Sequence, residues 1–113
     1  MRQRTKNDCV IVAIAVASGR SYKEIKDIFG KLDRGGMLWH EIEWLLSQTG
    51  NWRRYRKSKL NLSSWVQSHS GRYVVLLDKL TQMHAVAVVD GVVHGEYAEQ
   101  WGIVAIWKFE GVQ

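Results

Sequence analysis

The sequence predicts an α+β fold, with helices in the first half of the chain and an antiparallel sheet in the second. Up to about Gly50, apolar residues recur at helical spacing. Beyond it, β-branched and aromatic residues form short runs with a period of two. No internal repeat, low-complexity tract or proline interrupts the 113 residues. A chain of this length has room for one hydrophobic core, so we expect residues 1–113 to form a single domain.

The first predicted helix spans Cys9 to Ser18 and is apolar on nearly every side. Asn7 or Asp8 is placed to cap its N-terminus, and Gly19 is placed to end it. A helix that is apolar all round is buried among other elements. We therefore expect this helix at the centre of the molecule.

Two more helices are predicted before the sheet. Ser21 and Glu24 have the spacing of a capping box, and Gly30 is placed to end the helix that they begin. A third helix is expected between Gly36 and Gly50. Its apolar positions at helical spacing are Leu38, Ile42, Leu45 and Leu46.

The sheet is predicted from four runs of β-branched and aromatic residues. They are Arg72 to Leu77, His84 to Val89, Val92 to His94 and Ile103 to Phe109. Asp90-Gly91 predicts a type I′ hairpin, because both turn positions require positive φ. One more helical turn is expected around Leu62 to Gln67, ahead of these strands.

The chain is basic, with a formal net charge of +5 and a pI near 9.6. The densest basic residues are Arg53, Arg54, Arg56, Lys57 and Lys59, interleaved with Trp52 and Tyr55. Such a segment could grip phosphates and stack bases. It could equally be a solvated strand and loop with its aromatic rings facing the core. We favour the second interpretation, so a nucleic acid is the less favoured partner.

Neither a membrane span nor a signal peptide is predicted. The longest apolar run, Val10 to Ala17, is far shorter than the roughly 20 residues of a spanning helix. The single cysteine cannot form an intramolecular disulfide, which is compatible with a reducing cytoplasm. One cysteine also excludes zinc sites built from cysteine clusters, and we expect no metal or organic cofactor.

Cys9 is the candidate nucleophile, because the first turn of a buried helix favours thiolate over thiol. The alternative is an inert buried cysteine. His84 opens a predicted strand, which would hold its ring rigidly enough for a general base; the alternative is a histidine at the core edge. Gln3 is near enough in sequence for its side-chain amide to bind an oxyanion together with the Cys9 backbone N–H. The alternative is that Gln3 belongs to a frayed N-terminal tail.

Together these segments resemble a known family. The residues Gln3 to Ile25, Gly71 to Leu77 and His84 to His94 are similar to small papain-like cysteine peptidases of the bacteriocin-processing type, often found in phages. The resemblance implies a papain-like fold, with the Cys9 helix packed on the sheet. It also implies Cys9 as nucleophile, His84 as base, Gln3 as oxyanion donor, and a peptide or isopeptide substrate.

The sequence departs from this family at the residue that orients the histidine, commonly an Asp on the strand after the hairpin. A two-residue turn at Asp90-Gly91 places Gly95 in that slot. Glu96 is one residue away and points to the other face, unless a β-bulge turns it round. The same register places His94 opposite Ala87, on the face away from His84, which indicates a structural or surface residue.

Two functions are therefore expected from the sequence. The preferred one is a cysteine hydrolase, working in a cytoplasm, which would be that of the host if a phage encodes the chain. The alternative is a papain-like scaffold without activity that binds or inhibits a host protein. The vacant orienting position at Gly95 and the six tryptophans, whose large rings are favoured in cores and at interfaces, support the alternative.

Overall fold

The computed structural model describes residues 7–30, 39–56, 58–79 and 82–111. Over these residues the chain forms four helices and a five-stranded antiparallel sheet, so the predicted α+β class is confirmed. The helices are α1 (Asn7–Ser18), α2 (Tyr22–Phe29), α3 (Trp39–Thr49) and α4 (Leu62–Trp65), the last continued by a 3₁₀ turn at Val66–Ser68. The strands are β1 (Asn51–Tyr55), β2 (Arg72–Asp78), β3 (Met83–Val89), β4 (Val92–His94) and β5 (Ile103–Gly111).

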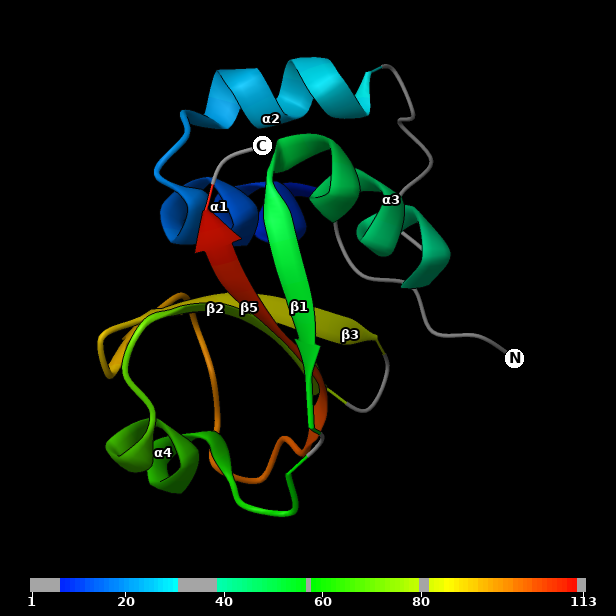
Figure 1. The fold of residues 1–113 in the computed structure, drawn as a ribbon. Helices are drawn as coiled ribbons and strands as arrows, with labels where there is room; N and C mark the ends of the chain where they lie inside the picture. Colours follow the sequence, from blue (N-terminus) through cyan, green and yellow to red (C-terminus); the bar gives the residue numbers. More distant parts are fainter. Residues whose placement is uncertain (1–6, 31–38, 57, 80–81, 112–113) are drawn as a thin grey trace.

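The strands lie in the order β1-β5-β2-β3-β4, with every neighbouring pair antiparallel. Strand β5, the last in sequence, is thus an inner strand, between β1 and β2 (Figure 1). The predicted hairpin is confirmed: Asp90 and Gly91 have φ of 48° and 84°, both positive as a type I′ turn requires. Its register pairs Val89 with Val92, which fixes which side chains of β3 and β4 share a face.

Helix α1 begins at Asn7, earlier than the capping pattern predicted. Asp8 therefore lies inside the first turn instead of capping it, and its carboxylate accepts a hydrogen bond of 2.6 Å from the Tyr22 hydroxyl. The other end agrees with the prediction: Gly19 has a φ of 76°, and its N–H donates to the Ala15 carbonyl.

The predictions for α2 and α3 are confirmed. Ser21 Oγ accepts from the Glu24 backbone N–H, and Glu24 reaches back to the Ser21 N–H, which completes the capping box. Gly30, with a φ of 76°, ends α2. In α3 the predicted apolar positions Ile42, Leu45 and Leu46 are buried, whereas Leu38 lies outside the described residues.

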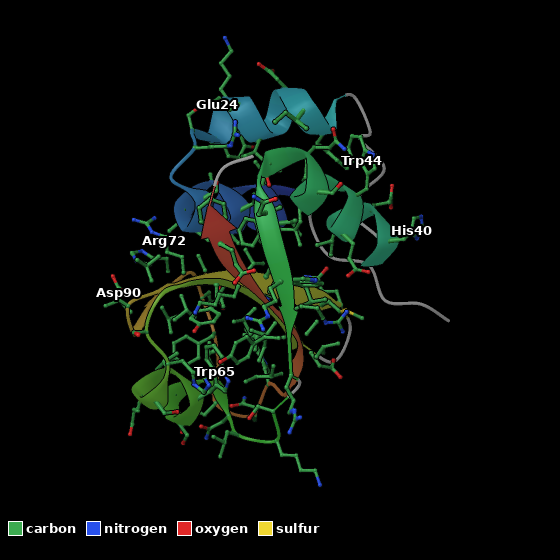
Figure 2. All side chains as sticks on the ribbon, viewed as in Figure 1. Glu24, His40, Trp44, Trp65, Arg72 and Asp90 are labelled. Atoms are coloured by element: carbon green, nitrogen blue, oxygen red, sulfur yellow. The ribbon has the colours of Figure 1, made fainter. Side chains whose placement is uncertain are left out.

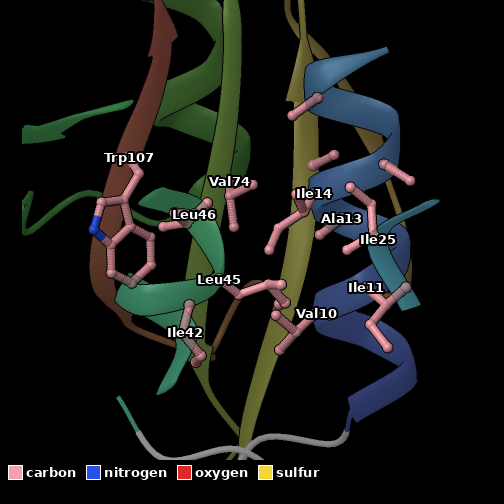
Figure 3. Close-up of a cluster of buried hydrophobic side chains, with 14 of the residues drawn as sticks. Val10, Ile11, Ala13, Ile14, Ile25, Ile42, Leu45, Leu46, Val74 and Trp107 are labelled. Atoms are coloured by element: carbon pink, nitrogen blue, oxygen red, sulfur yellow. The ribbon is translucent and has the colours of Figure 1, made fainter. Parts of the chain in front are cut away.

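Each face of the sheet carries its own hydrophobic cluster. On one face, α1 and α3 pack against the sheet side chains Val74, Leu76, Ala85, Ala87, Ala105 and Trp107, and α2 packs on α1 and α3 (Figures 1 and 3). We call this the helix face. On the other face, α4 and Trp101 pack against Tyr73, Val75, Leu77, Val86, Val88, Ile103 and Ile106. We call this the α4 face.

Aromatic rings fill the outer part of the α4 face. His69 stacks on Trp65 with ring centroids 4.0 Å apart, and its Nδ1 lies 2.7 Å from the Trp65 carbonyl oxygen. Tyr55 and Tyr73 meet Trp65 edge-on (Figure 2 labels Trp65). Rings in edge-to-face and stacked geometry stabilise such a cluster beyond their buried area. The cluster accounts for His69 as a structural residue.

Candidate functional site

Cys9 lies in the first turn of α1, on the helix face of the sheet. Its side chain is half-buried and packs against the apolar cluster beneath α1. The backbone N–H groups of a first turn point toward an anion at this position, and the positive end of the helix dipole favours the thiolate. The thiol is therefore partly accessible and lies at the positive end of the helix dipole.

His84 is the second residue of β3 and is also half-buried. It is paired with Leu77 of β2, and this register puts both side chains on the α4 face. There its ring meets the buried Trp101 edge-on, with centroids 5.8 Å apart, and its Nε2 atom is buried. The Trp101 indole and strands β2 and β3 hold the His84 imidazole in place and keep bulk water from one side of the ring.

Sequence reasoning counted Trp101 among the six tryptophans but assigned it no role beside His84. Trp101 lies just before β5, outside every period-two run, so no periodicity marked it. The only signal was the number of tryptophans in a chain of this length. In the structure the Lys79 ammonium lies 5.2 Å from the Trp101 ring centroid, which is within the range of a cation–π contact.

Cys9 and His84 lie toward the same end of the sheet. Arg72 is paired with Val89 at the end of β3, and its guanidinium donates to the Val16 carbonyl near the end of α1. Helix α1 packs along β3, and the end of α1 lies near the end of β3. The two elements therefore run in the same direction and begin at the same end (Figure 3). The first turn of α1 is thus on the His84 side of the molecule.

The two side chains approach this end from opposite faces of the sheet, because Cys9 belongs to the helix face and His84 to the α4 face. Strand β4 pairs only with Ala87, Val88 and Val89, and no other described strand covers the first part of β3 on that side.

Gly95 occupies the position where the resemblance implies a residue that orients His84. Gly95 has a φ of 126°, and a Cβ built on it would lie 3.0 Å from Val86 Cγ1. The position is therefore shaped for glycine, and a carboxylate side chain would be strained there. Glu96 is exposed and follows the last paired residue of β4, and the β3–β4 ladder over 87–94 has no bulge that would turn it toward His84.

Two other candidates are placed differently. His94 is exposed and pairs with Ala87 as predicted, which puts it on the helix face and away from His84. Gln3 lies outside the described residues. Its assignment as oxyanion donor therefore remains an implication of the family resemblance.

The basic segment forms β1 and the residues that follow it. Trp52 packs against Phe109, and Tyr55 packs into the aromatic cluster of the α4 face, so both rings point into the molecule. Arg53 lies 3.7 Å from Glu110, and Arg54 lies 3.6 Å from Glu43 and over the Trp107 ring. The aromatic rings of this segment serve packing, while the guanidinium groups face solvent.

Among the described residues, no group of three or more His, Cys, Asp or Glu side chains is arranged to hold a metal ion. Over the same residues, no helix is long and apolar enough to cross a membrane.

We compared the chain with models of protein families, with curated proteins and with solved structures, and none of them matches it.

Proposed function

We propose that this chain is a cysteine hydrolase with a papain-like arrangement, which cleaves an amide or related acyl bond. Cys9 is the nucleophile, His84 the general base and Gln3 the oxyanion donor. The observation that carries the proposal is the placement of the half-buried Cys9 in the first turn of α1, at the end of the sheet where Trp101 holds His84. The peptide or isopeptide substrate and the phage or bacterial cytoplasm rest on the family resemblance.

The chemistry follows from the residue types. The Cys9 thiolate attacks the acyl carbon, and the Cys9 backbone N–H with the Gln3 amide stabilises the oxyanion. The imidazolium of His84 gives its proton to the leaving amine as the C–N bond breaks. Water then loses a proton to His84 and attacks the thioester, which releases the acid and regenerates the thiolate.

The orienting position favours a second candidate, a papain-like scaffold that binds a host protein without hydrolysis. Gly95 has no side chain to hold the imidazole tautomer, and a Cβ at this position would crowd Val86. A dyad without an orienting group retains part of its catalysis, since nucleophile, base and oxyanion hole act together. The two candidates therefore differ in whether Cys9 is a low-pKa thiol coupled to His84.

The experiment that separates them is the pH dependence of Cys9 alkylation by iodoacetamide in the native chain. Cys9 is the only cysteine, so the label reports on one thiol. For a hydrolase we expect rapid labelling well below the ordinary thiol pKa of about 8.5, and loss of that labelling in His84→Ala. His94→Ala is the matched control, because His94 is exposed on the neighbouring strand and faces away.

Slow labelling that is equal in the parent chain and in His84→Ala would reject the hydrolase. The scaffold interpretation would then stand, and an unfolded sample is recognised beforehand by circular dichroism. Rapid labelling that His94→Ala also abolishes would mean that general destabilisation, and not a thiolate–imidazolium pair, controls the reactivity.

A further inference from the structure

A lysine lies beside the proposed general base, on the same face of the sheet. Leu77 of β2 is paired with His84 of β3, and this register puts both side chains on the α4 face. The ladder continues by one rung past the two strands, because the Lys79 N–H donates to the Gln82 carbonyl over 3.0 Å. Side chains alternate along a strand, so Lys79, two residues after Leu77, also belongs to the α4 face. It is diagonal to His84, and such positions are about 7–8 Å apart.

The Trp101 ring lies against both side chains. It meets the His84 imidazole edge-on, with centroids 5.8 Å apart, and the Lys79 ammonium lies 5.2 Å from its centroid. Trp101 is only 9% exposed, and Lys79 is half-buried. A cation–π contact of this kind restricts a long side chain that would otherwise move in solvent. The positive charge of Lys79 is therefore held at a defined place beside His84.

No carboxylate of a described residue forms an ion pair with this ammonium. The ion pairs between described residues all use arginines, and none includes Lys79. Asp78 precedes Lys79, but alternation along β2 puts it on the helix face, where its strand partner Met83 packs. Glu99, in the loop before β5, accepts a hydrogen bond of 3.0 Å from the Ser63 hydroxyl of α4. A half-buried cation with this surrounding favours an anionic ligand.

We propose that Lys79 binds a carboxylate of the substrate, on the leaving-amine side of the bond that is cleaved. The inference rests on the proposed function, in which the His84 imidazolium gives its proton to the leaving amine. A carboxylate held next to His84 then belongs to the part of the substrate that carries this amine. An extended chain spans about 3.5 Å per residue, so a spacing of about 7–8 Å places the carboxylate one or two residues beyond the bond.

Two parts of a peptide could supply this carboxylate, its C-terminus or an acidic side chain. In the first case the reaction would release short C-terminal pieces. In the second it would cut inside a chain, ahead of an Asp or Glu. Both ligands present the same charged group to Lys79, so matched peptides are needed to separate them.

The test measures peptide binding to the isotopically labelled full chain carrying Cys9→Ala, which cannot turn the peptides over. The readout is the indole N–H signal of Trp101, identified by its absence in Trp101→Phe. The three peptides are acetyl-Ala-Ala-Ala with a free C-terminus, the same peptide as its C-terminal amide, and acetyl-Ala-Glu-Ala amide. We expect at least one of the two carboxylate peptides to bind about tenfold more tightly than the neutral amide.

The matched protein variants are Lys79→Gln and Lys108→Gln, which remove the same charge from the same face of the sheet. The Lys108 ammonium also lies over an aromatic ring, 5.9 Å from the Tyr73 centroid, but Tyr73 is at the other end of β2. We expect Lys79→Gln to lower the affinity for the carboxylate peptide about tenfold and Lys108→Gln to leave it almost unchanged. Lys79→Arg keeps both the charge and the cation–π contact, so it should retain most of the binding.

Three results would overturn the proposal. The first is equal binding of the neutral amide and of both carboxylate peptides. The second is carboxylate binding that Lys79→Gln leaves unchanged, or that Lys108→Gln weakens equally, since net charge alone would then explain it. The third is the same loss in Lys79→Arg as in Lys79→Gln, which would assign the effect to packing on Trp101 and not to charge.

The binding test and the alkylation test fail separately. Rapid, His84-dependent alkylation of Cys9 without carboxylate binding would reject the Lys79 subsite and keep the hydrolase. Slow alkylation together with Lys79-dependent binding would reject the hydrolase, and Lys79 would then hold a carboxylate of a protein partner. Tighter binding of the free C-terminus than of the glutamate peptide would assign the subsite to chain ends, and the reverse order would assign it to acidic side chains.

Discussion

At the scale of single residues, two features stand near the candidate site: the backbone conformation of Gly95 and the hydrogen bond of Asp8. Gly95 adopts a φ that other residues avoid, and a Cβ built on it would lie 3.0 Å from Val86 Cγ1, so the Val86 side chain would have to shift. Asp8 lies next to Cys9 in sequence and is bound by Tyr22 from the following helix.

Placing at this position the carboxylate that the resemblance implies, by Gly95→Asp, should not create an orienting residue. The φ of 126° and the contact with Val86 should lower the free energy of unfolding by about 1–3 kcal/mol, and Cys9 alkylation should not accelerate. Urea unfolding and the iodoacetamide assay measure the two effects. Gly102→Asp is the control, because a Cβ there meets nothing within 4 Å. A Gly95→Asp chain that is stable and alkylated faster would show that this slot accepts an orienting residue.

The Tyr22 hydroxyl should titrate above the ordinary tyrosine range. Its hydrogen bond to Asp8 raises the pKa, with smaller contributions from desolvation and from the Asp8 charge. The folded state thus holds this proton more tightly than the unfolded state. The resulting stabilisation is complete below the ordinary pKa of about 10 and is lost as pH rises through the raised value.

Tyrosinate absorbance, taken as the difference between the parent chain and Tyr22→Phe, isolates this residue. Asp8→Asn should return the pKa of Tyr22 toward its ordinary value. Asp27→Asn, an exposed change on α2, should leave it where it was. A Tyr22 titration that ignores Asp8→Asn would contradict the assigned cause.

At the scale of elements, local signals determine helix ends and the hairpin. At the start of α2, the side chains of Ser21 and Glu24 each accept a hydrogen bond from the other residue's backbone N–H. These interactions lower the pKa of Glu24. The largest cause is its hydrogen bond from the Ser21 backbone N–H, which favours the ionised carboxylate. The capping box therefore stabilises the start of α2, and its removal should destabilise the whole helix.

Ser21→Ala removes the oxygen that accepts from the Glu24 N–H, so the free energy of unfolding should fall by about 1 kcal/mol. Chemical denaturation of the variant measures this loss. Ser70→Ala, in an exposed loop, is the control and should change stability by much less. Equal stability of Ser21→Ala and the parent chain would mean that tertiary packing alone holds the start of α2.

These local signals explain what was predictable from the sequence. The capping box, the Asp90-Gly91 turn and the β3–β4 register depend on neighbours in the chain, and all three were predicted. The pairing of β1 with β5 depends on residues far apart in sequence, so the segment around Arg53 could be interpreted only as strand and loop. The face that His84 occupies depends on which cluster its strand neighbours join, which periodicity alone cannot decide.

At the scale of the whole molecule, helix α1 lies closely over the sheet because β3 presents small side chains to it. Ala85 and Ala87 are buried on the helix face, beneath a helix whose own buried residues include Val10 and Ile14 (Figure 3). Small residues let backbones approach and leave no free volume at the contact. The distance between the Cys9 helix and the His84 strand is thus set by two alanines.

Ala87→Leu should force α1 away from β3 and lower the free energy of unfolding by about 1–3 kcal/mol. Thermal unfolding measures this cost. Val92→Leu on β4, where the side chain is 57% exposed, is the control and should have little effect. A fully stable Ala87→Leu would indicate that the interface between α1 and the sheet is loosely packed.

The inner position of β5 has a consequence for how the chain is made. Residues 103–111 leave the ribosome after the other four strands, yet they join β1 to β2 and supply the side chain of Trp107 on the helix face. During synthesis, the nascent helices and β2 keep apolar surface exposed until β5 has emerged. Folding therefore cannot finish before these residues are made, and shielding by a ribosome-associated chaperone would matter most in the seconds before they appear.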